Sequence, residues 1–292
     1  MDSNKRKLSL KYSFNETKKF KKKKLITSIE NLSNEILYEI FDYLDGCQTF
    51  QSFGNLNYRF DELLKSSSFL FKIDDVSILN LNEIISLNKQ IFSLKLYTSS
   101  HVQQLLLSSF IIDSPLHHLQ SFSVSYVKSD VLISILQELR FLTRLQSLTI
   151  HMYDVPMDVA KAYQLVFSLR TLKYYKFSIC MKDLSVLLPI ATNEQFTSIE
   201  TLHIDHSCNF EELSKIISYT PELHNLKFIH GLHVALTNTI IPSITLPNLT
   251  CLSICMYGVH FDDFEIFMQN IHANLKTLKI IIKCENLTYI NS

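Results

Sequence analysis

Glycine is scarce in this sequence, and the common nucleotide-binding and catalytic motifs are missing. Only four glycines occur among 292 residues, which argues against folds built on glycine-rich phosphate loops or many tight hairpins. The chain has no G-x-x-x-x-G-K, G-x-S-x-G, H-E-x-x-H or G-x-G-x-x-G motif. Nothing in it assembles a nucleophile, a base and an orienting acid. We therefore expect a protein that is not an enzyme and that needs no cofactor.

Metal-binding patterns are also missing. The six cysteines form no C-x-x-C pair and have no histidine at zinc spacing. The nearest approach to a ligand cluster is His203, Asp205, His206 and Cys208. In a strand, His203 and Asp205 share one face, so we expect surface polar residues rather than a metal site. The cysteines are expected to be reduced and to pack as small hydrophobic residues.

No signal peptide opens the chain, and no apolar run approaches the roughly 20 residues that cross a bilayer. Apolar residues make up 47% of the chain and charged residues 19%, which is typical of a folded protein. We expect a soluble protein of the cytoplasm, the nucleus or both.

The charge is distributed unevenly. Residues 1–24 carry ten Lys or Arg against Asp2 and Glu16, a net charge of +8, so residues 25–292 carry −8. This basic arm has too little apolar material to form a core and is expected to be disordered. Its two basic clusters are spaced like a bipartite nuclear-import signal, for which we select Lys5, Arg6, Lys18, Lys19, Lys21 and Lys22. A solvated tail and contact with the backbone of a nucleic acid remain alternatives.

From residue 25 the composition changes to that of compact helices. Apolar residues recur at helical spacing from Leu32 to Leu44, with acidic residues between them. Ser33 is placed to start this helix, and Asp45-Gly46 to end it with glycine in the left-handed region. A second apolar set follows from Phe50 to Leu64. So small a helical module is expected to share part of its apolar face with a partner.

The segment NLSNEILYEIFDYLDGCQTFQSFGNLNYRFDELL closely resembles the F-box, whose usual form is Leu-Pro-x-Glu, then I-L-x-x-I-F-x-Y-L, an acidic turn and an aromatic-basic helix. We assign residues 25–72 to it; Ser33 replaces the usual proline, and Arg59-Phe60 replaces a basic-Trp pair. The resemblance implies binding to the S-phase-kinase-associated adaptor of a cullin–RING ubiquitin ligase. The residues it selects for adaptor binding are Leu32, Ser33, Ile36, Leu37, Ile40 and Phe41.

A six-residue unit recurs through residues 73–292. It reads apolar, polar, small polar, apolar, polar, apolar, and begins at residues 91, 119, 145, 169, 199, 223, 249 and 275. Alternation of this kind predicts short strands with their apolar side chains inward. The stretches 129–142, 155–169 and 209–223 are expected to be helices between strands, with capping pairs Ser100/Gln103 and Asn209/Glu212, whereas 229–248 lacks a helical pattern.

The unit resembles the leucine-rich repeat L-x-x-L-x-L, without the Asn or Cys that normally follows; the fourth such site holds Phe177. The fold class we predict is α/β, an all-helical F-box followed by a leucine-rich-repeat-like solenoid with short parallel strands. Outward strand positions would form a face for a protein target. The predicted face comprises Lys95, Tyr97, His151, Lys173, Tyr175, His203, Asp205 and Lys227, with Lys279 and Ile281 at its far end.

Three functions follow from these features. The resemblances imply substrate recruitment for an SCF-type ubiquitin ligase, with catalysis by proximity alone. The alternatives are an F-box and repeat protein that binds partners outside ubiquitination, and a nuclear protein that contacts nucleic acid through the basic arm.

Overall fold

The structure is a computed structural model that describes residues 28–67, 69–73, 91–97, 115–153, 158–179, 185–230, 241–257 and 261–283. The basic arm and its predicted import signal, Lys5 to Lys24, lie outside the described residues, as does the predicted capping pair Ser100/Gln103. In the described part, no helix combines the length and the apolar character needed to cross a membrane.

Short helices open the described chain. Their bounds are η1 Ile29–Asn31, α1 Asn34–Asp42, α2 Gly46–Phe53 and α3 Tyr58–Ser66. Ser33 is the N-cap residue of α1, as predicted, although its side chain caps no helical amide. Asp45 caps α2 by accepting a 3.0 Å hydrogen bond from the amide of Gln48. The predicted glycine stop of α1 is wrong, because Gly46 is the first residue of α2 and α1 ends before it.

An aromatic core holds these helices together. Leu37 and Phe60 are fully buried, and Phe53 lies between Phe41 and Phe60 with ring centroids 5.1 and 5.5 Å away. The apolar spacing of α1 and α3 thus produces a small core with one side of α1 turned inward. We call η1 and α1 to α3 the helical module.

Nine parallel strands form the main sheet, in the order β1-β2-β3-β4-β5-β6-β7-β9-β11. Their bounds are β1 Phe69–Ile73, β2 Ile91–Tyr97, β3 Ser121–Val127, β4 Ser147–Met152, β5 Tyr174–Ile179, β6 Thr201–Cys208, β7 Asn225–His230, β9 Cys251–Tyr257 and β11 Thr277–Lys283. β1 pairs with β2, so the end of the segment assigned as 25–72 belongs to the sheet. The α/β class with parallel strands is confirmed.

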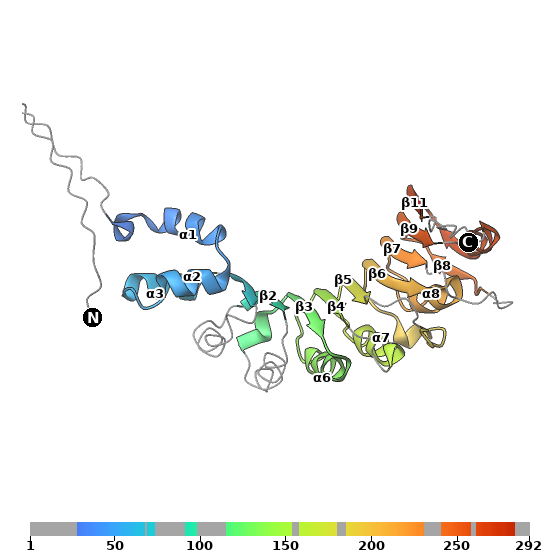
Figure 1. Ribbon diagram of the computed structural model, residues 1–292, viewed down its shortest axis with the longest axis horizontal. Helices are drawn as coiled ribbons and strands as arrows, with labels where there is room; N and C mark the ends of the chain where they lie inside the picture. Colours follow the sequence, from blue (N-terminus) through green and yellow to red (C-terminus); the bar gives the residue numbers. More distant parts are fainter. Residues whose placement is uncertain are drawn as a thin grey trace, which may run out of the picture.

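Helices cover one side of this sheet. Figure 1 shows the strands along the inner side of an arc and helices α6 (Ser129–Leu139) and α7 (Val159–Phe167) along its outer side. Together with α8 (Phe210–Ile217), they confirm the three predicted helices, and Asn209 and Glu212 form the predicted capping box. A further helix, α9 (Phe261–Asn270), was not predicted.

Short elements complete the described chain. They are the 3-10 turns η3 Pro115–His118 and η4 Asn193–Gln195 and the two-stranded pair of β8 Ile244–Leu246 with β10 Ile271–Ala273. The described part of segment 229–248 holds strands and no helix, as its sequence predicts.

The strand pairing corrects one of the eight predicted repeats. Ser147 of β4 lies opposite Tyr174, and Tyr174 lies opposite Thr201. The fourth unit therefore begins at Leu172 and reads LKYYKF, three residues later than predicted. The sequence did not show this register because two tyrosines are adjacent in it and lie on opposite faces of β5. Tyr174 is half-exposed, whereas Tyr175 is fully buried. In this register the position that follows the unit is Cys180 rather than Phe177; Cys180 lies outside the described residues.

A ladder of backbone hydrogen bonds joins successive repeats just before each strand. The carbonyl of Gln146 accepts hydrogen bonds from the amides of Lys173 and Tyr174 at 2.8 and 2.9 Å, and the carbonyl of Lys173 accepts from those of Glu200 and Thr201 at 2.8 and 3.0 Å. The same pattern continues through the last strand. The backbone amides and carbonyls at each bend are thereby hydrogen-bonded to those of the next repeat.

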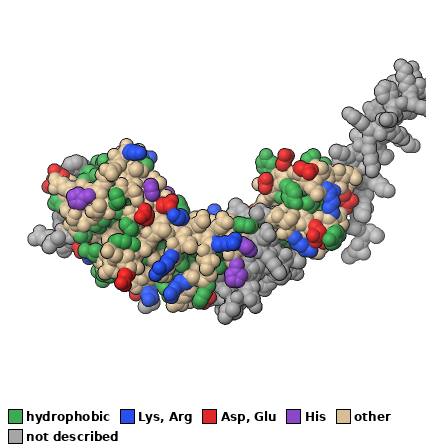
Figure 2. Space-filling view, turned by 180° about the vertical axis from the view of Figure 1, so that it is seen from behind, with side chains coloured by type: hydrophobic (Ala, Val, Ile, Leu, Met, Phe, Trp, Pro, Cys, Tyr) green, Lys and Arg blue, Asp and Glu red, His purple; other side chains and the backbone are tan. Residues whose placement is uncertain are grey.

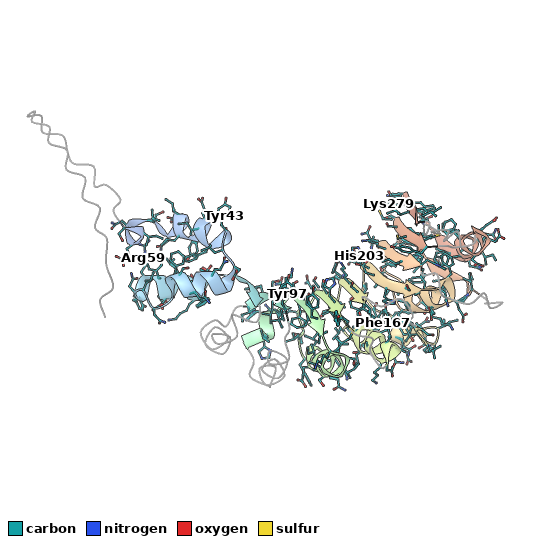
Figure 3. All side chains as sticks on the ribbon, viewed as in Figure 1. Tyr43, Arg59, Tyr97, Phe167, His203 and Lys279 are labelled. Carbon is teal, nitrogen blue, oxygen red and sulfur yellow. The ribbon has the colours of Figure 1, made fainter. Side chains whose placement is uncertain are left out.

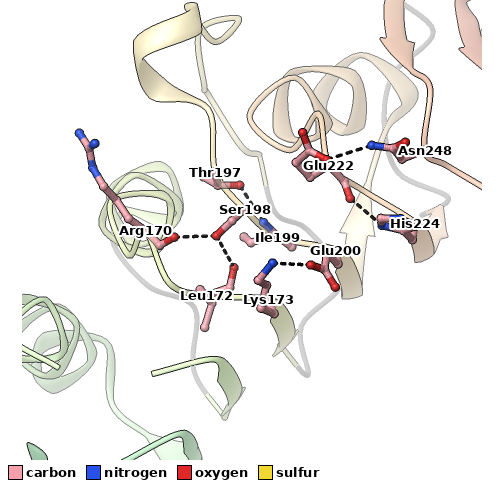
Figure 4. Close-up of polar contacts among 10 residues, drawn as sticks. All are labelled: Arg170, Leu172, Lys173, Thr197, Ser198, Ile199, Glu200, Glu222, His224 and Asn248. Carbon is pink, nitrogen blue, oxygen red and sulfur yellow. Dashed lines mark hydrogen bonds and ion pairs between the residues drawn. The ribbon is translucent and has the colours of Figure 1, made fainter. Parts of the chain in front are cut away.

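Side chains reinforce this edge of the sheet. Figure 4 shows the Ser198 hydroxyl donating to the carbonyls of Arg170 and Leu172, at 2.6 and 3.2 Å, and Lys173 paired with Glu200. One repeat further on, the amide of Asn248 donates to Glu222 at 2.9 Å. The edge residues are thus bound to one another across repeats.

Two buried tyrosines behind the strands differ in one hydrogen bond. Both are 0% exposed, and their rings meet edge to face with centroids 6.1 Å apart. The Tyr163 hydroxyl lies 2.7 Å from Nε2 of His206, whereas the Tyr175 hydroxyl has no hydrogen-bond partner among the described residues. Burial raises the pKa of both phenols well above the usual value.

Substitution by phenylalanine should therefore have opposite effects at these two positions. Tyr175→Phe removes a buried, unpaired hydroxyl and is expected to raise the free energy of unfolding by about 1 kcal/mol. Tyr163→Phe leaves Nε2 of His206 buried without a donor and should lower it by about 2 kcal/mol. Urea unfolding of both variants and the parent measures the difference. Equal effects of the two substitutions would contradict the assignment.

Candidate interaction surfaces

The outer side of α1 carries the exposed apolar surface of the helical module. Ser33 and Ile36 are exposed, with Ile36 at 43%, while Leu32 and Ile40 are half-buried and pack against the core. These four residues recur along one side of the helix. Of the residues predicted to bind the adaptor, these are the ones at the surface.

Leu37 and Phe41 face the other way. They are 0% and 3% exposed, and Phe41 packs on Phe53. Both side chains fill the module's own core, so in this structure neither is exposed to contact a partner. The helical period places them 100° or more around the helix axis from Ile36. The sequence pattern alone did not show which of these sides faces the core.

The helical module exposes further aromatic residues outside α1, and its charged residues are mostly acidic. Tyr43 and Tyr58 are 90% and 78% exposed, and Tyr43 projects from the end of α1 in Figure 3. Residues 28–67 contain seven Asp or Glu but only Arg59 and Lys65 as cations. A hydrogen bond from Ser33 holds the pKa of the neighbouring Glu35 carboxyl below its usual value. Exposed apolar residues on an acidic module are suited to a protein partner.

Hydrogen bonds from the Arg59 side chain, on α3, hold the start of α1 against α3. Its guanidinium donates to the carbonyls of Glu30 and Leu32 at 2.7 and 2.6 Å, and to Oδ1 of Asn34 at 2.9 and 2.6 Å. These bonds satisfy carbonyls of the turn that leads into α1. From the sequence, Arg59 was known only as a residue at a position that is usually basic in the F-box pattern. Its role in positioning α1 becomes evident from these hydrogen bonds.

Arg59→Lys should loosen this turn while keeping the charge. The ammonium cannot reproduce the forked geometry, so we expect the free energy of unfolding of the module to fall by about 1–2 kcal/mol. Amide hydrogen exchange should accelerate across residues 28–42. Lys65→Gln is the matched control, because the Lys65–Glu62 ion pair, at 2.9 Å, is exposed to solvent and should contribute little to stability. Unchanged exchange in Arg59→Lys would refute the role.

The second candidate surface is the outward side of the strands. Outward residues are half-exposed and alternate with buried ones along β4, β5 and β6. Figure 3 places Tyr97, His203 and Lys279 along the inner side of the arc and Phe167 on the helix side. Of the predicted face, the structure places outward Lys95, Tyr97, His151, His203, Asp205 and Lys227, together with Lys279 and Ile281. We call this surface the strand face.

Two members of the predicted face are wrong. Tyr175 points inward and is 0% exposed, and Lys173 lies at the edge in the backbone ladder, paired with Glu200. Both errors follow from the three-residue slip of the fourth repeat. The outward lysine of that repeat is Lys176, which lies opposite Thr149 and His203 and which sequence reasoning missed. The available signal was the spacing, because a start at residue 172 lies midway between the neighbouring starts at 145 and 199, whereas a start at 169 does not.

Charged groups meet at the middle of the strand face. Asp205 lies 3.0 Å from the ammonium of Lys176 and 3.9 Å from that of Lys227. Burial, and next the Lys227 charge, lower the pKa of His203; burial and the Lys176 charge lower that of His151. Both imidazoles are therefore mainly neutral at pH 7. Nearer the first repeats, the Lys95 ammonium lies 5.2 Å from the ring centroid of Tyr97.

Figure 2 shows the molecule hollowed between the helical module and the C-terminal strands. Lys, carboxylate and His side chains line this hollow. A hollow with side chains of both signs provides specific polar contacts for a partner.

His206 and Cys208 are residues of β6 that face the core rather than the strand face. They are 2% and 0% exposed, and burial lowers the pKa of His206 to about 4 and raises that of the Cys208 thiol. Nδ1 of His206 lies 3.0 Å from the Ser207 carbonyl, which can only accept, so Nε2 accepts from Tyr163. His203 and Asp205 point the opposite way. Among the described residues, no group of three or more His, Cys, Asp or Glu could hold a metal ion.

Comparison with known proteins adds no family. No family model matches this chain, and no curated protein matches it. Two surfaces of the protein, the exposed side of α1 and the strand face, are therefore the features that indicate a function.

Proposed function

We propose that this chain recruits a protein target to an SCF-type cullin–RING ubiquitin ligase. Its helical module is an F-box that binds the S-phase-kinase-associated adaptor, and its strand–helix units form a leucine-rich-repeat-like solenoid. The observation that carries the proposal is α1, which turns Leu37 and Phe41 into the module's core and leaves Ile36 exposed in a sequence pattern that resembles the F-box. An apolar stripe on so small a module supports a partner-binding role.

The strand face supports the second half of the proposal. It presents residue types that form polar contacts with proteins, and the arc puts them on a hollowed side. In this scheme the chain is not an enzyme. It accelerates ubiquitin transfer by holding the target near a conjugating enzyme that the cullin–RING complex binds, so its contribution is proximity.

Binding of the purified full-length chain to the purified adaptor tests the proposal. Titration calorimetry is expected to give a 1:1 complex, and addition of the cullin–RING subunits should give one larger complex on gel filtration. A folded chain that fails to bind the adaptor would overturn the proposal. Adaptor binding without cullin assembly would instead favour an interaction protein outside ubiquitination.

A further inference from the structure

The strand face differs in charge from the body of the protein. In strands β2 to β11 of the main sheet, the outward positions whose side chains are described hold four lysines and the single carboxylate Asp205. Residues 25–292 as a whole carry −8. A local excess of positive charge on an otherwise acidic protein makes the electrostatic potential at that surface positive, which favours an anionic partner.

The lysines occupy one register across the sheet. Lys176, His203 and Lys227 are neighbours on β5, β6 and β7, and Lys279 follows two strands later on β11 through Ser253. Adjacent strands are about 4.8 Å apart, so successive lysines of this series are spaced by about 10 Å. Lys95 lies in the same register on β2. The row therefore runs across the strands.

Asp205 positions two of these ammonium groups and distinguishes between anionic partners. Its contacts at 3.0 and 3.9 Å hold Lys176 and Lys227 on either side of it, and the Lys227 side chain remains 50% exposed. A polyphosphate chain would bring a charge against this carboxylate at every position of its backbone. A peptide can place its acidic residues at the lysines and a neutral or basic residue at Asp205.

We infer that the strand face binds an acidic peptide segment of a protein partner through the row formed by Lys95, Lys176, Lys227 and Lys279. The inference deepens the proposed function, on which it rests for the identity of that partner as a recruited target.

Fluorescence anisotropy with a labelled oligoglutamate peptide tests this inference. The full chain is used with the six lysines of residues 18–24 changed to Gln, because the basic arm would otherwise bind the probe. Lys176→Glu/Lys227→Glu is expected to weaken binding at least about tenfold. Lys161→Glu/Arg170→Glu changes the net charge equally at exposed positions within and just after α7 and should leave binding within about twofold.

Three results would overturn the inference, and the first two are no binding of the probe by the parent and equal loss in both double variants. A third is tighter binding of a single-stranded oligonucleotide than of the peptide, which would assign the face to nucleic acid. Urea unfolding of each variant detects misfolding. Adaptor binding, measured on the same variants, should be unchanged; its absence in the parent would refute the proposed function but leave the peptide result standing.

Discussion

Replacing Ile36 with Asp is expected to weaken adaptor binding about 100-fold, or roughly 3 kcal/mol, without unfolding the helical module. Ile36 is 43% exposed and contributes little to the core, so the isolated protein should tolerate the charge. In the complex the same carboxylate would be buried in an apolar interface without a partner. Titration calorimetry with the purified adaptor measures the loss.

Two further substitutions separate binding from folding. Phe141→Asp adds a carboxylate at another exposed apolar residue, 72% exposed, after α6 and should leave adaptor affinity unchanged. Leu37→Asp puts a charge into the core and should unfold the module, with loss of helical circular dichroism. If Ile36→Asp bound the adaptor as tightly as the parent, the exposed side of α1 would not be the binding surface.

Acidification should destabilise the protein through His206. The folded state holds the pKa of this imidazole at about 4, mainly by burial, against 6.5 for an ordinary histidine. The unfolded state therefore binds more protons between these two pH values, and the free energy of unfolding falls as the pH is lowered through that window. The full loss is about 3 kcal/mol, and it is absent above pH 7.

His206→Gln tests the origin of this pH dependence. Glutamine can still accept the hydrogen bond from Tyr163 but does not titrate. Urea unfolding at several pH values between 4 and 7 should give the variant a slope shallower than that of the parent. Parallel loss of stability in both proteins would assign the acid sensitivity to other groups.

The helices and the inner faces of the strands were accessible from the sequence. The alternation of apolar and polar residues along strands such as β4 and β6 is regular in the sequence. Each such strand can bury its apolar side in only one orientation, so the alternation specifies both the type of element and its inner face. For the same reason seven of the eight predicted repeats have the predicted register.

The residues that make up the candidate surfaces were harder to predict from the sequence. Tyrosine is compatible with either face of a strand, so the pair Tyr174-Tyr175 left the fourth repeat open to a three-residue slip. The slip replaced Lys176 by Lys173 in the predicted face and turned Tyr175 outward. Pairing with the two neighbouring strands resolves it, because only one register continues the backbone hydrogen bonds on both sides.

By itself, then, the sequence determined the helical and strand periods, the parallel α/β class and the uneven charge of arm and body. Those properties are local, since each depends on the spacing of residues within one element or on composition. Only the tertiary structure decided which side of α1 is exposed, that Arg59 holds its start, and that Asp205 lies between Lys176 and Lys227. Each of these depends on contacts between residues far apart in the chain, and strand register and helix packing set those contacts.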